Sequence, residues 1–185
     1  MPGFTISKRD PMHVIGFWTE CPTRDVLFEL LRLRTELLED RYTHLLAGAQ
    51  PQNALERAIV DHGIGAFGVL LGIPGDPDRV CLMLAGRFTG GTAPEPLRLA
   101  RIPEGLWAGF SAEGEALPTL RSLCTRALHG DLDGKFERTG LCSLICFPAD
   151  PANSEYRMFT HVRRARKAAP DCAEKPASSL RRGYF

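Results

Sequence analysis

The sequence has no excess charge of one sign, no long apolar run and no N-terminal secretion signal. Its 185 residues carry 23 Lys and Arg against 22 Asp and Glu, a formal net charge of +1. This balance excludes a chain that binds nucleic acid through overall basic charge. No stretch of about 18 consecutive apolar residues predicts a transmembrane helix, and residues 1–9 lack a basic segment followed by an apolar one. We therefore expect a cytoplasmic protein with no membrane partner and no direct nucleic-acid binding.

The sequence also lacks the spacings typical of common metal and catalytic sites. Its six cysteines form no Cys-x-x-Cys pair, and its histidines show no ligand spacing. We expect reduced, mostly buried thiols and no metal. No Gly-x-Ser-x-Gly nucleophile motif occurs. Residues 63–68 match Gly-x-Gly-x-x-Gly, but between a predicted helix and a predicted strand, the reverse of a dinucleotide site. They indicate a helix end, and no cofactor is expected.

What is present is a regular succession of apolar patterns. Residues 12–20 predict a strand, and residues 28–45 have helical spacing that ends at Gly48. Thr23 is a candidate N-cap, and a second helix is predicted from Asn53, with Glu56 at the capping-box position. Strands are predicted over 67–73 and 79–88. The pattern then recurs as a strand over 106–113, a helix over 117–128 and strands over 141–147 and 156–163.

Two offsets indicate that the chain repeats a unit. The loop at residues 74–77 resembles the loop at 148–151, at an offset of 74, and three residues recur at an offset of 93: Gly16, Phe17 and Glu20 match Gly109, Phe110 and Glu113. We predict an α+β fold of duplicated β-α-β-β units, with halves at about residues 4–90 and 97–162. The two units form one antiparallel sheet with helices on one face and a concave ligand cleft on the other.

The predicted domain covers residues 1–162, and a basic tail follows at 163–185. The tail holds seven Lys and Arg against two Asp and Glu. We expect it to lie outside the core and to pack on a surface or on a neighbouring chain, which makes a homodimer possible.

Alternation along the first strand of each unit predicts which side chains face the cleft. Ile15 and Phe17, like Ala108 and Phe110, suit the helix side. Trp18 and Trp107 then face the other way, and Gly16 and Gly109 leave room beside them for an apolar ligand.

Glu137 has two interpretations. It is either a carboxylate at the floor of the cleft, which a cationic ligand would offset, or a loop residue paired with Arg138 or Lys135. From its position alone the second interpretation is favoured, because most glutamates are exposed.

Several segments together resemble the GyrI-like small-molecule-binding family, the effector-binding domain of certain AraC- and MerR-class regulators. His13-Val14-Ile15-Gly16 matches the first strand, residues 62–64 loosely match an aromatic-Gly-Val stretch, and Met83-Leu84-Ala85-Gly86 matches a strand that has an aromatic residue in place of Met83. The most specific segment is Ile102–Gly114, which matches iP-x-g-x-y-A-v-F-x-x-x-G. Residues 136–139, Phe-Glu-Arg-Thr, match f-E-x-Y with Thr in place of Tyr. The resemblance covers about residues 4–162.

This resemblance implies a central cleft in which Glu137 recognises cationic or polar aromatic ligands. The expected ligand-binding residues are Trp18, Trp107, Glu137, Gly16, Gly109, Met83 and Phe136. The expected function is binding of a hydrophobic, aromatic or cationic small molecule by a stand-alone sensor or sequestering protein. The alternatives are a hydrolase of electrophilic toxic molecules, with Glu137 as its general base, and a protein-interaction role such as gyrase inhibition.

Overall fold

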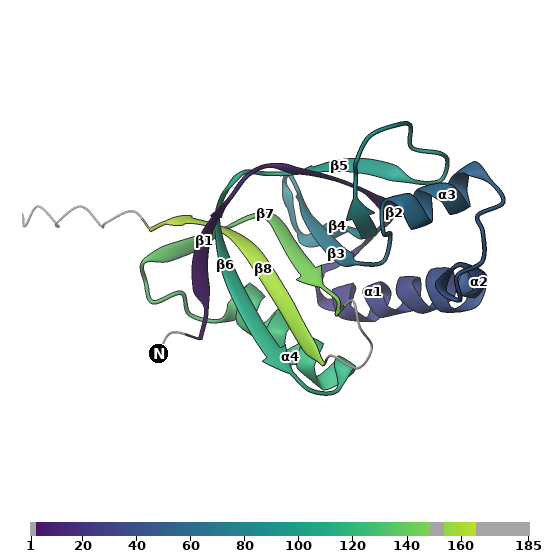
Figure 1. Cartoon of the computed structure of the whole chain (residues 1–185). Coiled ribbons are helices and arrows are strands. Elements are labelled where there is room, and N and C mark those ends of the chain that lie inside the picture. Colours follow the sequence, from purple (N-terminus) through teal and green to yellow (C-terminus); the bar gives the residue numbers. More distant parts are fainter. Residues whose placement is uncertain (1–2, 149–153, 166–185) are drawn as a thin grey trace, which may run out of the picture.

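Two strands, a helical region and two further strands follow one another in each part of the chain, although the helical region is longer in the first part (Figure 1). The computed structural model describes residues 3–148 and 154–165. The first half consists of β1 (Thr5–Arg9), β2 (Met12–Pro22), α1 (Val26–Arg34), α2 (Thr43–Leu46), α3 (Ala54–Asp61), β3 (Phe67–Ile73) and β4 (Asp76–Arg87). The second half consists of β5 (Arg98–Ile102), β6 (Gly105–Glu113), α4 (Ala116–His129), β7 (Phe136–Cys146) and β8 (Glu155–Arg164).

All eight strands form one antiparallel sheet in the order β1-β6-β8-β7-β3-β4-β2-β5. The predicted class, α+β with one antiparallel sheet and helices on one face, is confirmed. Phe17 faces Leu84 across β2 and β4, and Phe110 faces Met158 across β6 and β8. The offsets of 93 and 74 seen in the sequence therefore also relate these two strand pairs.

Each edge strand pairs with the half of the chain to which it does not belong. β1 precedes β2 in sequence but pairs with β6, and Thr5 lies opposite Gly109. β5 precedes β6 but pairs with β2, and Arg98 lies opposite Gly16. The predicted halves are thus linked by an exchange of edge strands.

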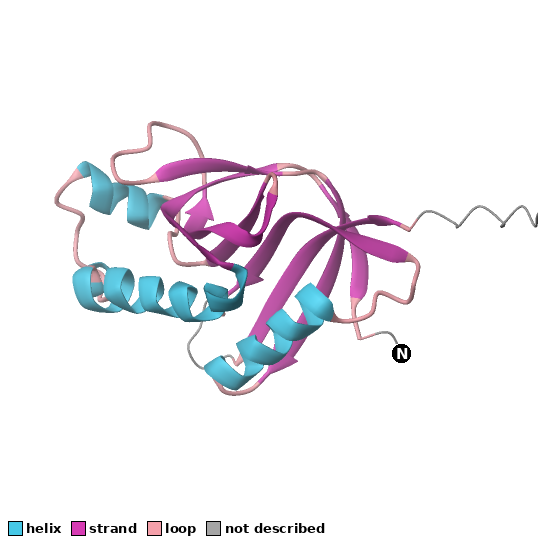
Figure 2. Cartoon of the chain, turned by 180° about the vertical axis from the view of Figure 1, so that it is seen from behind, coloured by secondary structure: helices cyan, strands magenta, loops and turns pink. Residues whose placement is uncertain are grey.

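The two faces of the sheet carry separate apolar cores, as the alternation predicted. Ile15, Phe17, Ala108 and Phe110 belong to the core beneath the helices. The other core consists of strand residues alone, and among its members are Val14 and Trp107. α1 and α4 lie on the same face of the strongly bent sheet (Figure 2), and α1 contacts β2 and β4 whereas α4 contacts β6 and β8.

Local interactions fix the helix limits. The Asn53 side chain accepts a hydrogen bond from the Glu56 backbone N–H, which is the cap half of the predicted capping box at α3. The Glu56 carboxylate returns to Gln52 N–H, one residue before the cap, rather than to the N–H of Asn53. The region expected to be one helix over 28–45 is instead α1, a π-helical stretch over Thr35–Arg41, and α2. Thr23 is not its cap, because its hydroxyl donates to the Pro77 carbonyl at 3.2 Å. Gly63 and Gly65 adopt positive φ between α3 and β3, as expected of a helix end.

Two strands were absent from the sequence-based prediction. β1 and β5 are five residues each and mostly exposed, so they lack the apolar run that marks a buried strand. β7 begins at Phe136, five residues before the predicted start, and its pairing with β8 shifts register between Arg138 and Ser143. The shift falls at Thr139 and Gly140, which directly precede the apolar run that starts at Leu141.

β8 extends through Arg164, so the first two residues of the predicted tail belong to the sheet. Residues 166–185, which include Cys172, lie outside the described residues, and the expected packing of the tail stays a prediction. The five cysteines within the described residues are free, and Cys21 and Cys142 among them are buried. No helix in residues 3–148 and 154–165 is long and apolar enough to cross a membrane.

Candidate functional site

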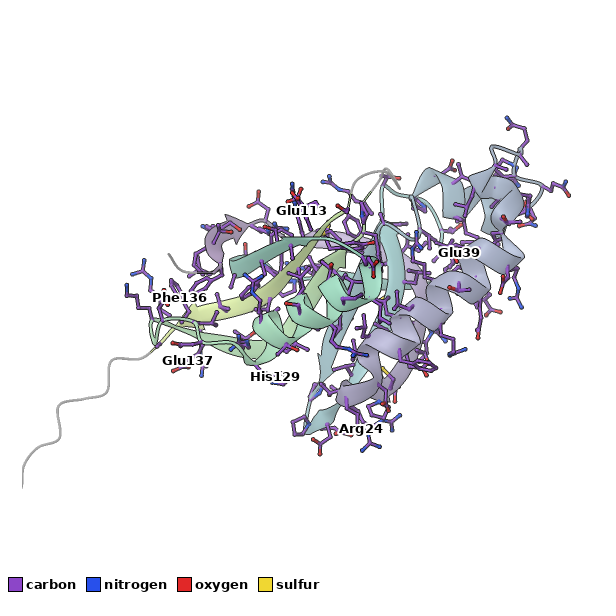
Figure 3. All side chains as sticks on the ribbon, turned by 90° about the horizontal axis from the view of Figure 1, so that it is seen from below. Arg24, Glu39, Glu113, His129, Phe136 and Glu137 are labelled. Carbon is purple, nitrogen blue, oxygen red and sulfur yellow. The ribbon has the colours of Figure 1, made fainter. Side chains whose placement is uncertain are left out.

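A groove of about 770 Å³ lies between α1 and α4, and we call it the α1–α4 groove. One wall comes from the first half of the chain and the other from the second. The lining residues are Thr23, Arg24, Val26, Leu27, Phe28, Leu31, Arg32, Thr35, Glu36, Leu117, Arg121, Cys124, Thr125, Leu128 and His129. Figure 3 views the molecule from below and labels Arg24 on the α1 side and His129 at the end of α4.

Helical spacing explains why both walls are apolar. Leu27 and Leu31 are one turn apart on α1, and Leu117, Cys124 and Leu128 fall on one stripe of α4. The inner residues of each helix pack on the sheet. The groove-lining side chains lie beside them, at the edge of this contact, and are only partly buried. Phe28 is 68% exposed and Leu117 is 47% exposed. The groove therefore presents apolar and aromatic surface to solvent.

The α1 wall carries charges that already have partners. Arg32 lies between Glu29 and Glu36 and donates to both, with its closest contact to Glu36 at 2.7 Å. Arg24 lies 3.6 Å from Asp25. Glu36 is the carboxylate among the residues that line the groove, and it is engaged by Arg32.

The α4 wall contains no carboxylate. Residues 116–129 include Arg121, Arg126 and His129 and no Asp or Glu. Burial raises the pKa of the Cys124 thiol to about 11, so this groove-lining thiol is protonated at neutral pH.

The structure brings together two of the sequence-predicted residues on the opposite face. Trp18, which is 40% exposed, and Met83 line a smaller hollow of about 390 Å³. The Arg98 guanidinium lies over the Trp18 ring, 5.4 Å from its centroid. An aromatic hollow on the face opposite the helices is thus present, although it is smaller than the groove.

Trp107 does not line that hollow. It has no exposed surface, and its ring packs edge-on against His161 at 5.2 Å between centroids. The His161 ring nitrogens in turn contact the Thr139 hydroxyl and the Glu104 carbonyl. The single cleft lined by Trp18, Trp107 and Glu137 is therefore not what the structure contains.

Gly16 and Gly109 do not open space either. A Cβ on Gly16 would meet the Leu84 carbonyl oxygen at 2.2 Å, and one on Gly109 would meet the Phe159 ring at 2.8 Å. These glycines allow close approach of neighbouring groups, which sequence alone could not distinguish from an empty volume.

Glu137 and Phe136 lie beyond α4, on its far side from α1 (Figure 3). The Glu137 carboxylate is 43% exposed and forms an ion pair with Arg163 at 3.0 Å. Its partner is thus Arg163 rather than Arg138 or Lys135. Phe136 packs against the core beneath the helices. That these seven residues bind a ligand stays a prediction.

The residues that sequence reasoning missed are those of the groove itself. Leu27, Leu31 and Leu128 of the groove pack only partly against the core beneath the helices. The signal that could have indicated the groove is Phe28. The buried apolar face of α1 is already supplied by Val26, Leu30 and Leu33, so a further large apolar residue on this helix lies outside that face. No cluster of three or more His, Cys, Asp or Glu that could hold a metal occurs within the part of the chain that the structure describes.

Comparison with known proteins gives matches in structure but not in sequence. No model of a protein family matches the chain, and no curated protein matches it. An integron cassette protein from the mobile metagenome of Vibrio cholerae has a TM-score of 0.59 at 14% identity, over 88% of this chain and 97% of that one. The protein SAV2435, solved bound to tetraphenylphosphonium, has a TM-score of 0.60 at 10% identity, over 86% and 93%. The C-terminal domain of EcmrR has a TM-score of 0.53 at 10% identity, over 88% and 98%.

These likenesses show the fold. At such identities the ligands and partners of those proteins do not transfer to this chain. The shared architecture is consistent with the GyrI-like resemblance of the sequence.

Proposed function

We propose that the chain binds a hydrophobic aromatic small molecule in the α1–α4 groove, as a sensor or sequestering protein of the GyrI-like type. The observation that carries the proposal is the groove, whose volume of about 770 Å³ falls within the range of roughly 300–1,000 Å³ usual for small-molecule sites. SAV2435, which has the same fold, was solved bound to tetraphenylphosphonium, an aromatic cation, and this supports binding of an aromatic molecule.

The apolar walls supply a driving force for such a ligand. Removing apolar surface from water contributes about 25 cal/mol per Å², and Phe28 and Leu117 keep much of their surface in water. An aromatic ring that packs on Phe28 adds about 0.5–1.5 kcal/mol beyond the buried area. Because the walls belong to different halves, a bound ligand contacts both and stabilises their packing.

The proposal is tested with the neutral fluorescent probe N-phenyl-1-naphthylamine, whose emission rises in apolar sites. We expect saturable binding and a dissociation constant about tenfold higher for Phe28→Ala, because the ring contact and its buried area are lost. Leu46→Ala is the matched control, since Leu46 is 64% exposed and lies outside the groove. Equal binding by the Phe28 and Leu46 variants would contradict the proposal.

The sequence-predicted site is tested in the same titration with Trp18→Ala. Trp18 lines the hollow on the opposite face. A loss of binding in this variant, with Phe28→Ala unchanged, would move the ligand to that face. Intact binding in Trp18→Ala together with a loss in Phe28→Ala supports the groove.

A further inference from the structure

We propose that the α1–α4 groove selects organic anions, that is, aromatic molecules that carry a negative charge such as a carboxylate or sulfonate. The inference rests on the proposed function and adds the charge of the ligand. It follows from which charged groups in the groove already have partners and which do not.

Arg121 occupies the middle of the apolar stripe on α4. It follows Leu117 by one turn and precedes Cys124 and Leu128, so its side chain rises from the same wall. Its exposed guanidinium has no ion pair or side-chain hydrogen bond within the described residues. Residues one turn away on either side, Leu117 and Thr125, are uncharged.

The other charged side chains of the groove are compensated. Arg32 is held by Glu29 and Glu36, and Arg24 lies beside Asp25. A cationic ligand would have to compete with Arg32 for Glu36, whose contacts to that guanidinium measure 2.7 and 2.8 Å. An anionic ligand gains Arg121 without breaking any existing pair. His129, at the C-terminal end of α4, adds an imidazole to the same wall.

The carboxylate expected to recognise a cation lies elsewhere. Glu137 is on the far side of α4 and is paired with Arg163. The recognition chemistry inferred from the sequence, carboxylate to cation, is therefore replaced in the groove by guanidinium to anion.

The test uses two ions of the same shape and opposite charge, tetraphenylborate and tetraphenylphosphonium. Their dissociation constants are measured by calorimetric titration in a sodium buffer, because potassium precipitates tetraphenylborate. We expect the folded chain to bind tetraphenylborate more tightly. Arg121→Gln should weaken tetraphenylborate about fivefold, the effect of losing one partly screened charge contact, and tighten tetraphenylphosphonium by a similar factor, because the same charge attracts one ion and repels the other. Arg121→Glu should reverse the preference.

Two controls separate the possible outcomes. Arg101→Gln removes an exposed arginine from β5, outside the groove, and should leave the ratio of the two dissociation constants unchanged. Phe28→Ala should weaken the binding of both ions, which locates them in the groove.

The charge inference is overturned if both ions bind in the groove and tetraphenylphosphonium binds as tightly as tetraphenylborate or more tightly. It is also overturned if Arg101→Gln changes the ratio as much as Arg121→Gln does. In both cases the proposed function stands. The proposed function fails if Phe28→Ala leaves the dissociation constants of both ions and of the neutral probe unchanged.

Discussion

Cys124 places a thiol in the wall of the α1–α4 groove, and burial raises its pKa to about 11. The thiolate is the reactive form of cysteine, so a raised pKa slows alkylation at neutral pH. Cys142 provides an internal comparison, because burial raises its pKa further, to about 12, and it lies in the core on the opposite face.

We expect iodoacetamide to label Cys124 slowly at pH 7.5, and the rate to rise about tenfold per pH unit toward pH 11 while the fold persists. A bound groove ligand should slow this labelling and leave Cys142 unchanged. Mass spectrometry of the digested protein resolves the two sites. Neutral-pH labelling of Cys124 as fast as that of an unfolded control peptide would show that the thiol is not buried in the groove.

For single residues, the sequence predicted which face of the sheet a side chain lies on, but not which residues it contacts. Alternation along β2 and β6 correctly separated Phe17 and Phe110 from Val14 and Trp107. It could not show that Trp107 is covered completely, or that Arg163 is the partner of Glu137, because both depend on strands more than 20 residues away in sequence. Facing is a local property of a strand, whereas burial and pairing depend on the assembled sheet.

At the scale of elements, the C-terminal end of α4 is hydrogen-bonded by a guanidinium from β7. Arg138 donates to the carbonyls of Ala127 at 2.6 Å, Arg126 at 3.1 Å and Gly130 at 2.6 Å. These belong to the last helical turn and the residue after it, where a cation is favoured by the helix dipole. The Arg126 carbonyl also accepts a hydrogen bond from the Gly130 backbone N–H. Burial lowers the pKa of Arg138, and Asp131 opposes this shift. The contact holds the end of α4, and with it Leu128 and His129 of the groove.

We expect Arg138→Met to lower the free energy of unfolding by about 1.5–3 kcal/mol, because three carbonyls lose a charged donor. Arg138→Lys should lose less, since it keeps the charge but not the planar fork. Urea denaturation followed by circular dichroism measures both. A change of under about 0.5 kcal/mol in Arg138→Met would show that water replaces the guanidinium at no cost.

Helical spacing predicted the limits of α4 within one residue, because Pro118 and Gly130 mark its ends. It did not predict the π-helical stretch after α1 or the separation of the two helices that forms the groove. Spacing identifies the apolar face of a helix, but how far a neighbouring helix covers that face is set by the bend of the sheet between them.

At the scale of the whole molecule, the exchanged edge strands make the sequence halves differ from the spatial halves. Residues 1–92 contain β1 without its partner β6, and they lack β5, which pairs with β2. A segment of nearly the same length, residues 11–103, contains β2, β4 and β3 together with β5 as the edge of β2.

We expect residues 11–103 expressed alone to retain more protected backbone amides than residues 1–92, because the backbone of β2 is paired on both sides. Hydrogen exchange measured by nuclear magnetic resonance compares the two segments. Equal or greater protection in residues 1–92 would show that the exchanged strands contribute little to each half.

The exchange also means that the two edge strands meet their partners at different times during synthesis, although they hold corresponding positions in the sheet. When the ribosome completes β5, its partner β2 already exists. β1 is made first, yet Gly109, which lies opposite Thr5, is 104 residues further along the chain. At about 5–20 residues per second, β1 waits on the order of 5–20 seconds for β6. During that interval a newly made chain presents Thr5–Arg9 as a strand without a neighbour. The adjacent Lys8 and Arg9 at its end are the kind of charged residues that keep such a strand from pairing with another chain.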